Sequence, residues 1–233
     1  MNNQLKGLIY FYMVDIRHSL KVFWIILLSI LMVSIAFGYY IKAIDGGMMT
    51  FSLTGPIYIY CSIVAFISVR EYIPFAIKMG ATRKNIFISI GIFFLLLSAV
   101  KAIVASLLQE LVLFLITGIG IDGFYFLHLA HFIDDTWYIR IGMDIMTIFF
   151  AMSFMFMLGL IFYRYGFFGG GITLGIVGVM FLFGIATGWI VDFIAEIISH
   201  LDMLFFIQLF AVGIFFYFLS FFILKRMTIV KMR

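Results

Sequence analysis

The sequence predicts an all-α integral membrane protein with six transmembrane helices, an N-terminal interfacial amphipathic helix and both termini in the cytoplasm. Three observations support this prediction. Of the 233 residues, 66% are apolar and only 11% are charged, whereas a soluble domain is about half apolar and about a quarter charged. Apolar runs near the length of about 20 residues that a bilayer requires recur along the chain. Basic residues gather in alternate loops, as the positive-inside rule requires.

The first 21 residues form an amphipathic segment ahead of the first span, within a single transmembrane domain that covers residues 1–233. Apolar residues recur at helical spacing on one side of this segment, and Asp15, Arg17 and His18 lie nearer the other side. Because these side chains are costly deep in lipid, we expect a helix that lies in the headgroup plane with its apolar face towards the lipid. The alternative is that the first spanning helix begins early.

The six predicted spans are apolar stretches with few charges. They cover residues 22–40, 53–69, 86–108, 141–163, 167–190 and 204–224. Each apolar residue at mid-helix contributes about −0.3 to −0.6 kcal/mol to insertion, against about +3 kcal/mol for one charge, so Lys101 does not exclude the third span. Leu111–Gly120 is too short for a seventh crossing. We expect it to be the top of a long third helix, or a re-entrant piece that extends towards Leu127.

The distribution of charge sets the orientation. Twelve of the 15 basic residues fall in the N-terminal segment, the loop after the second span, the turn between the fourth and fifth spans, and the C-terminal tail. The opposite loops carry most of the acidic residues. Since positively charged loops stay in the cytoplasm, both termini are predicted to lie inside, which requires an even number of spans.

Several classes of function are excluded by what the chain lacks. No loop is long enough for a soluble catalytic domain of about 100 residues. Cys61 is the only cysteine, so neither an intrachain disulfide nor a CxxC motif exists. The chain has no G-x-x-x-x-G-K-S/T loop for ATP and no H-E-x-x-H or G-x-S-x-G motif. We therefore expect no enzymatic activity of its own, and nothing indicates nucleic acid as a partner.

A short segment near the outer side contains histidines and aspartates at helical spacing. His128, His131 and either Asp134 or Asp135 would lie on one side of a helix, a pattern that can ligate a metal. The segment is also short and aromatic, as in the belts found at membrane interfaces. The interfacial belt is the preferred interpretation, and no metal site is predicted.

The loop after the second span is the most informative stretch. Within Arg70–Ile86, Pro74 suits the first turn of a helix, Gly80 suits the left-handed position after a helix end, and Thr82 can cap the third span. The pattern predicts a short separate helix at the cytoplasmic surface, with exposed apolar and basic side chains that dock in a groove of a soluble partner. The alternative is a surface hairpin that contacts only lipid headgroups.

This loop resembles a motif of one transporter family. Residues 78–84 read KMGATRK and are similar to the G-x-S/T-R-K/R loop of ABC-2-type transporter permeases, the membrane subunits of bacterial ABC exporters. The predicted layout of lead helix, six spans and cytoplasmic ends also resembles that family, in which this loop forms a coupling helix that docks on an ATP-binding subunit. The resemblance assigns that contact to Pro74, Phe75, Lys78, Met79, Gly80 and Arg83.

The resemblance also implies a function. The chain would be the permease subunit of an ATP-driven exporter in the cytoplasmic membrane of a bacterial cell. A separate ATP-binding subunit would hold ATP and Mg, and a second permease copy or a related permease would complete the path. The expected cargo is an amphipathic peptide, such as a toxin or an antimicrobial or bacteriocin-like peptide, or a hydrophobic drug. One departure is that Val191–Met203 supplies about one short helix, where the family usually has re-entrant helices.

Two alternatives to an exporter stay open. One is a non-transporting membrane scaffold, immunity or sensor protein that docks a soluble partner through the same basic loop. The other is the membrane subunit of an importer, which also needs partner ATPases. A polar path across the spans distinguishes a transporter from a scaffold.

Four polar residues in or beside the spans are the candidates for such a path, because polar side chains at this depth usually face a bundle interior or a water-filled cavity. They are Lys101, Gln109, Glu110 and Asp144. The alternative is structural pairing. Lys101 and Glu110 lie on opposite faces of one helix at about 100° per residue, so Asp144 is the candidate partner of Lys101. A second possible pair is Asp144 with Arg140, one helical turn away.

Glycines in the fifth predicted span are candidates for helix packing. Gly171 and Gly175, and again Gly184 and Gly188, have the G-x-x-x-G spacing that lets two helix backbones approach closely. The pattern indicates either packing within the chain or contact with another subunit.

Overall fold

The computed structural model describes residues 3–45, 48–120, 124–133, 135–199 and 201–225, and every structural statement below concerns these residues. In chain order the elements are α1 (Asn3–Asp45), β1 (Met49–Phe51), α2 (Thr54–Lys78), α3 (Arg83–Ile119), β2 (Phe124–Phe126), the 3₁₀ helix η1 (Leu129–Phe132), α4 (Trp137–Ala186), α5 (Trp189–Ser199) and α6 (Met203–Lys225).

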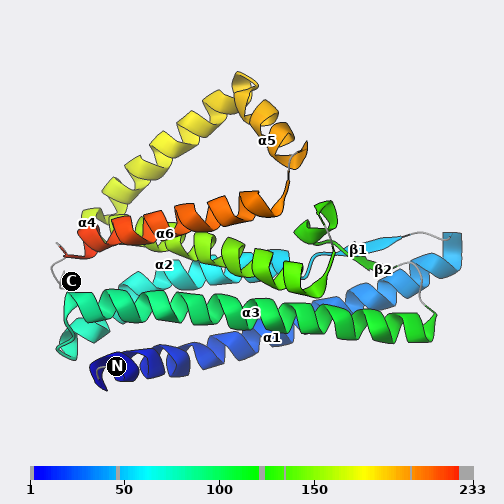
Figure 1. The fold of residues 1–233 in the computed structure, drawn as a ribbon, viewed down its shortest axis with the longest axis horizontal. Coiled ribbons are helices and arrows are strands. Elements are labelled where there is room, and N and C mark those ends of the chain that lie inside the picture. The colour runs from blue at the N-terminus through cyan, green and yellow to red at the C-terminus, as the bar shows by residue number, and fades with distance from the viewer. Residues whose placement is uncertain (1–2, 46–47, 121–123, 134, 200, 226–233) are drawn as a thin grey trace.

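The described helices confirm a membrane protein of the all-α class. Five of them, α1, α2, α3, α4 and α6, are long and apolar enough to cross a membrane. Helices α1, α2, α3, α6 and the first part of α4 lie side by side in one bundle (Figure 1). The two short strands were not predicted. They pair in parallel, with Met49 opposite Phe124.

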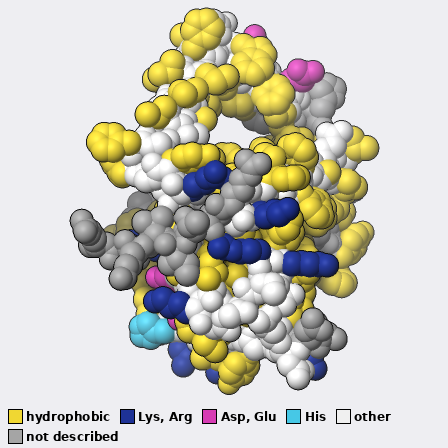
Figure 2. Space-filling model, turned by 90° about the vertical axis from the view of Figure 1, so that its left-hand side faces the viewer, with side chains coloured by type: hydrophobic (Ala, Val, Ile, Leu, Met, Phe, Trp, Pro, Cys, Tyr) yellow, Lys and Arg dark blue, Asp and Glu magenta, His cyan; other side chains and the backbone are white. Residues whose placement is uncertain are grey.

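The two ends of the bundle differ in charge. One end, called here the basic end, carries the start of α1, the α2–α3 turn, the bend in α4 and the end of α6 (Figure 1). Basic side chains gather over it, as Figure 2 shows. They come from Arg70, Lys78, Arg83, Lys84, Arg164 and Lys225. The predicted basic residues Arg226, Lys231 and Arg233 of the tail lie outside the described residues. The opposite end carries β1, β2 and η1 and is called the strand end.

The prediction of a separate interfacial lead helix is wrong. The lead and the first span form one helix, α1, of 43 residues, or about 65 Å at 1.5 Å per residue. Its apolar side faces the bundle rather than lipid, since Leu8, Tyr12 and Ile16 are 5%, 0% and 3% exposed. No helix-breaking residue separates the lead from the span, so the helix continues. The early start of the first helix, which the sequence left as the alternative, is what the structure has.

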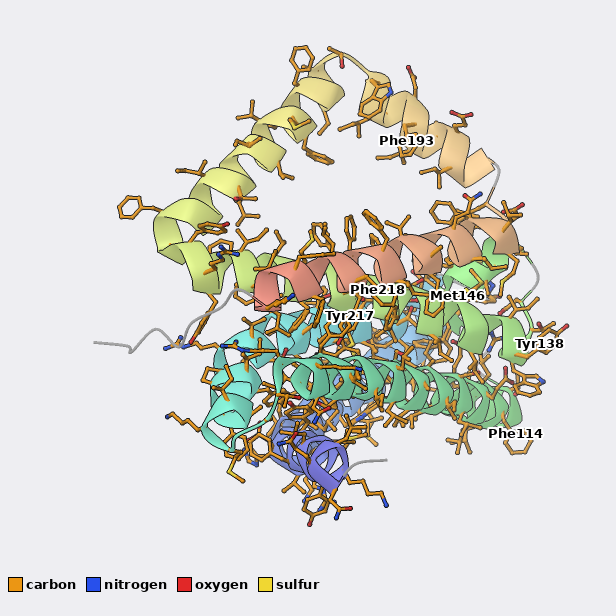
Figure 3. The ribbon with its side chains drawn as sticks, turned by 60° about the vertical axis from the view of Figure 1, so that its left-hand side comes forward. Phe114, Tyr138, Met146, Phe193, Tyr217 and Phe218 are labelled. Carbon is orange, nitrogen blue, oxygen red and sulfur yellow. The ribbon has the colours of Figure 1, made fainter. Side chains whose placement is uncertain are left out.

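The predicted short helix after the second span is not separate either. Helix α2 continues through Pro74 to Lys78, and its last turns bend across the basic end (Figure 3). A proline inside a helix removes one backbone hydrogen bond and bends the helix, so here it bends α2 instead of starting a new helix. The predicted ends are confirmed. Gly80 has a φ of 74°, and the Thr82 side chain accepts a hydrogen bond from the Asn85 N–H at 3.3 Å.

The predicted fourth and fifth spans lie in one helix, α4, on either side of Gly166. This residue has a φ of 69° and a ψ of −172°, a conformation that is essentially restricted to glycine. After it, residues 167–186 leave the bundle and form an arch with α5 (Figure 1). The fifth span was predicted to reach residue 190, but α4 ends at Ala186, and Gly188 with a φ of 80° precedes α5.

The short helix expected before the last span is present as α5, between Trp189 and Ser199. Phe193 of α5 lies on the side that faces α6 (Figure 3) and lines a hollow of about 470 Å³ together with Leu204 and Gln208. The arch therefore meets the start of α6, although an opening remains between it and the bundle (Figure 2).

The stretch after Leu111 continues α3 as far as Ile119, and Gly120, with a φ of 76°, ends the helix. The prediction that this stretch is the top of a long third helix is therefore correct as far as Gly120. Residues 121–123 lie outside the described residues. Strand β2 follows and pairs with β1 instead of entering the bundle as a helix.

Aromatic rings join the helices in the core. Tyr12 of α1 stacks on Tyr72 of α2 with ring centroids 4.5 Å apart. Tyr217 of α6 contacts Phe94 of α3 and Phe156 of α4 at 6.1 and 5.9 Å. Each such pair contributes about 0.5–1.5 kcal/mol beyond the area that it buries. The five long helices thus share one core, which holds the sites described next.

Candidate functional site

The α2–α3 turn places the predicted partner-binding residues together at the basic end. Lys78, Met79 and Gly80 are exposed, Met79 by 68%. Pro74 and Phe75 are half-buried. Arg83 is half-buried too, and its guanidinium donates to the Leu224 carbonyl of α6 at 3.5 Å. The surface available to a partner is therefore narrower than predicted.

This turn is fastened to the first turns of α1. The Gln4 amide donates to the Gly80 carbonyl at 3.1 Å and accepts from the Asn85 amide of α3. The Phe75 ring stacks on Phe11 with centroids 3.8 Å apart. Sequence reasoning missed Gln4, Phe11 and Asn85. The signal that was available is that Gln4 and Phe11 lie seven residues apart on the apolar side of the lead.

A hollow lies where the turn meets α1. It measures about 320 Å³, and its lining is mainly apolar, from Gly7, Leu8 and Phe11 of α1 and from Met79 and Ala81 of the turn. Because Lys78, Arg83 and Lys84 lie in or directly beside the turn, the surface combines an apolar recess with positive charge. Such a surface suits an apolar side chain of an acidic partner protein.

Lys101 lies in a box of aromatic rings. Its ammonium nitrogen is 3.9 Å from the ring centroid of Phe23, 4.6 Å from that of Trp24 and 4.5 Å from that of Tyr60. The side chain is 1% exposed, and Nζ has no hydrogen-bond partner among the described residues. The prediction that Asp144 pairs with Lys101 is wrong. The helices instead present rings from α1 and α2 to this lysine.

Asp144 belongs to a second cluster. It accepts hydrogen bonds from the Tyr58 hydroxyl of α2 and from His128 Nε2 at 3.1 Å. Because His128 Nδ1 accepts from the Ala130 N–H at 2.9 Å, the ring proton lies on Nε2, which therefore donates to the carboxylate. Asp144 and His128 are almost fully buried, with side chains 2% and 1% exposed. The cluster joins the segment before η1 to α2 and α4.

A third cluster lies around Arg140 at the strand end. Its guanidinium contacts Glu110 of α3 at 2.7 Å and also Asp135. The expected pairing of Arg140 with Asp144 is wrong, since each has other partners. His131 lies beside Asp135, with Nδ1 3.0 Å from Oδ2 and Nε2 2.6 Å from the Phe126 carbonyl. His131 therefore links the strand β2 to the Arg140 cluster.

The path candidates lie in three different clusters. Lys101 is in the aromatic box, Asp144 is with Tyr58 and His128, and Glu110, whose side chain is 52% exposed, is with Arg140. Gln109 is buried and lines a hollow of about 390 Å³ together with His131 and Asp135, so it lies beside the Arg140 cluster. In the described part of the chain no three metal-ligating side chains come together, and the predicted candidate Asp134 lies outside it.

Of the predicted packing glycines, Gly184 lies against another helix of the described chain: a Cβ there would lie 2.5 Å from Ile190 of the adjacent α5. Side chains added at Gly171 or Gly175 would meet no atom within 4 Å, and Gly188 ends α4. Close approach also occurs at other glycines. A Cβ at Gly159 would lie 2.9 Å from Val69 of α2, and one at Gly213 would lie 2.9 Å from the Phe150 Cα. Within the described residues, Gly171 and Gly175 thus face open space.

Comparisons with known proteins give no relative: no family model, no curated protein and no solved structure matches the chain. Its function has to be inferred from these sites.

Proposed function

We propose that this chain is the permease subunit of an ATP-driven ABC exporter in the bacterial cytoplasmic membrane. In this proposal a separate ATP-binding subunit, which holds ATP and Mg, docks on the α2–α3 turn at the basic end. The observation that carries the proposal is the attachment of that turn. Its residues are bonded to α1 through Gln4 and continue directly into α2 and α3.

The attachment supports a mechanical role. A displacement of the turn by a docked subunit acts at once on α1, α2 and α3, since Gln4 bonds both sides of the turn and Phe75 stacks on Phe11. A turn that served only to follow the positive-inside rule needs no such bonds. Packed helices transmit such a displacement because cores shift between discrete arrangements rather than deform.

The same proposal includes a second permease copy and an amphipathic cargo. The arch of α4 exposes apolar side chains and leaves Gly171 and Gly175 open, which suits close approach of another helix. The cargo class, amphipathic peptides or hydrophobic drugs, is proposed because Phe and Met side chains of the chain adapt to varied apolar ligands.

The test uses two exposed methionines at opposite ends. Met79 is 68% exposed at the turn, and Met48 is 75% exposed at the strand end. The tagged protein is purified from membranes of its native host, and co-purifying ATP hydrolysis is measured. Met79→Asp should lower that activity about tenfold or more, since burying even an uncharged polar group without a partner costs about 2–7 kcal/mol and an ionised carboxylate costs more. Met48→Asp should leave it unchanged. Absence of any ATPase with the wild-type chain would refute the proposal.

The second candidate is a membrane scaffold that docks a soluble partner without moving cargo. The separation of Lys101, Gln109 and Asp144 into different clusters favours it. Accessibility of a cysteine placed at Gln109 distinguishes the two functions. A transporter should expose this position to a water-soluble thiol reagent during ATP turnover, whereas in a scaffold its labelling should not depend on ATP.

A further inference from the structure

Lys101 is enclosed by the bundle. It lies midway along α3, between Arg83 and Ile119, its side chain is 1% exposed, and its ammonium lies against three rings of α1 and α2. The ammonium therefore points into the bundle instead of snorkelling to a headgroup. The positive charge has to be stabilised inside the bundle.

Aromatic rings stabilise this ammonium, and among the described residues no anion forms a salt bridge with it. The carboxylates of the neighbouring clusters are engaged elsewhere, Asp144 by His128 and Tyr58 and Glu110 by Arg140. The ammonium uses none of its donors among the described residues. Three rings within 5 Å of one point, without a hydrogen-bond acceptor, are the arrangement that recognises alkylammonium groups. The box therefore selects a positive charge of that shape rather than a pattern of hydrogen bonds.

An acidic hollow adjoins the box. It measures about 230 Å³ between α1 and α2, and Asp15 and Glu71 line it together with Ser19. Tyr60 forms one wall of the box, and its hydroxyl donates to Ser19 at 3.0 Å. Because Ser19 lines the hollow, this hydrogen bond joins the box to the hollow. Both carboxylates belong to exposed residues and attract cations. The hollow and the box thus favour the same class of ligand.

We propose that Phe23, Trp24 and Tyr60 form a subsite for the alkylammonium group of a cationic amphiphile, such as a lysine side chain of an amphipathic peptide. Lys101 is the built-in occupant of this subsite, and the cargo displaces it. Its long flexible stem allows the ammonium to leave the box. The role of the subsite in transport rests on the proposed function, whereas binding of the amphiphile does not.

The experiment follows Trp24 fluorescence in purified protein reconstituted in phosphatidylcholine nanodiscs. Trp137→Phe and Trp189→Phe leave Trp24 as the only tryptophan. The probes are dodecyltrimethylammonium, dodecanoate and uncharged dodecyl maltoside. We expect a saturable change with the ammonium probe alone. Lys101→Met should strengthen its binding about tenfold by removing the competitor, whereas Lys6→Met, at an exposed lysine of α1, should leave it unchanged. Tyr60→Ala should weaken it.

Two results would overturn the inference. Equal or weaker binding of dodecyltrimethylammonium to the Lys101→Met protein would show that Lys101 does not compete for the box. A saturable response to dodecanoate that disappears in the Lys101→Met protein would make Lys101 a receptor for anions. Neither measurement involves the ATP-binding subunit, so a failed inference and a failed exporter proposal are told apart by the co-purification experiment.

Discussion

The cluster around Asp144 allows a quantitative test. Its carboxylate is nearly fully buried and accepts hydrogen bonds from Tyr58 and His128. Tyr58→Phe removes one donor and leaves the ring in place. A hydrogen bond to a charged group contributes about 1.5–3 kcal/mol, so the free energy of unfolding should fall by that amount. Replacing both donors, as Tyr58→Phe with His128→Leu, leaves a buried charge alone and should cost about 3–5 kcal/mol.

The chain carries its own reporter for this test. Cys61 is the single cysteine and is fully buried, so the rate at which a thiol-reactive dye labels it follows the unfolded fraction. A loss of 1.5–3 kcal/mol corresponds to labelling about 10- to 140-fold faster. Tyr10→Phe, at a tyrosine that is 69% exposed, should change nothing. Tyr58 and Cys61 lie in the same helix, so loosening of α2 alone would also speed the labelling. The midpoint of an SDS titration followed by circular dichroism, which reports on all the helices, therefore serves as the second measurement.

One result would refute the reasoning. If Tyr58→Phe labels within about threefold of the wild-type rate and its SDS midpoint is unchanged, the bond to Asp144 contributes less than about 1 kcal/mol. The carboxylate would then not depend on its donors. A charge that needs no donors is not desolvated to the degree that its burial indicates.

Two further predictions concern packing. Gly213→Ala should lower the SDS midpoint, because the new Cβ would lie 2.9 Å from the Phe150 Cα and overpacking costs about 1–3 kcal/mol. Gly178→Ala, with open space around it, should leave the midpoint equal or raise it. An equal loss in both variants would contradict this prediction. Phe75→Ala should accelerate tryptic cleavage of the α2–α3 turn by removing a stacked pair worth about 0.5–1.5 kcal/mol. Phe114→Ala, at a ring that is 78% exposed, should not, and equal cleavage rates would show that the ring does not hold the turn.

The features that the sequence predicted correctly depend on local chemistry. Composition identifies the membrane class, because it reports directly on the solvent that surrounds each segment. Gly80 and Thr82 were placed correctly since a left-handed backbone and a helix cap need particular residue types at one position. The charge pattern follows the same logic, and its basic residues gather at one end of the folded bundle.

The features that were missed depend on competition between neighbouring signals. A proline such as Pro74 suits the first turn of a helix, but it can also lie inside a helix that packs well. In this chain Pro74 lies inside α2. Gly166 ends a span by its conformation, although the helical hydrogen bonding resumes at once. The continuity of α1 was missed because charged side chains in the lead indicated the membrane surface, whereas the exposed side of a long helix accommodates them as well.

The partners of the buried polar residues could not be predicted from local sequence patterns. Met49 pairs with Phe124 across a long stretch of chain, and the choice of aromatic rings rather than Asp144 around Lys101 depends on how three helices are rotated about their axes. Helical spacing correctly indicated that Lys101 and Glu110 do not pair. It contains no information on which neighbouring helix supplies the substitute.

The bend at Gly166 has a mechanical consequence. The part of α4 beyond it spans about 20 residues, or about 30 Å, and is joined to the bundle through a single glycine at one end and through α5 at the other. A change of only about 10° at that pivot would carry the far tip of this arm through about 5 Å. Small torsional adjustments at the basic end are thus converted into large displacements at the far end of the arm.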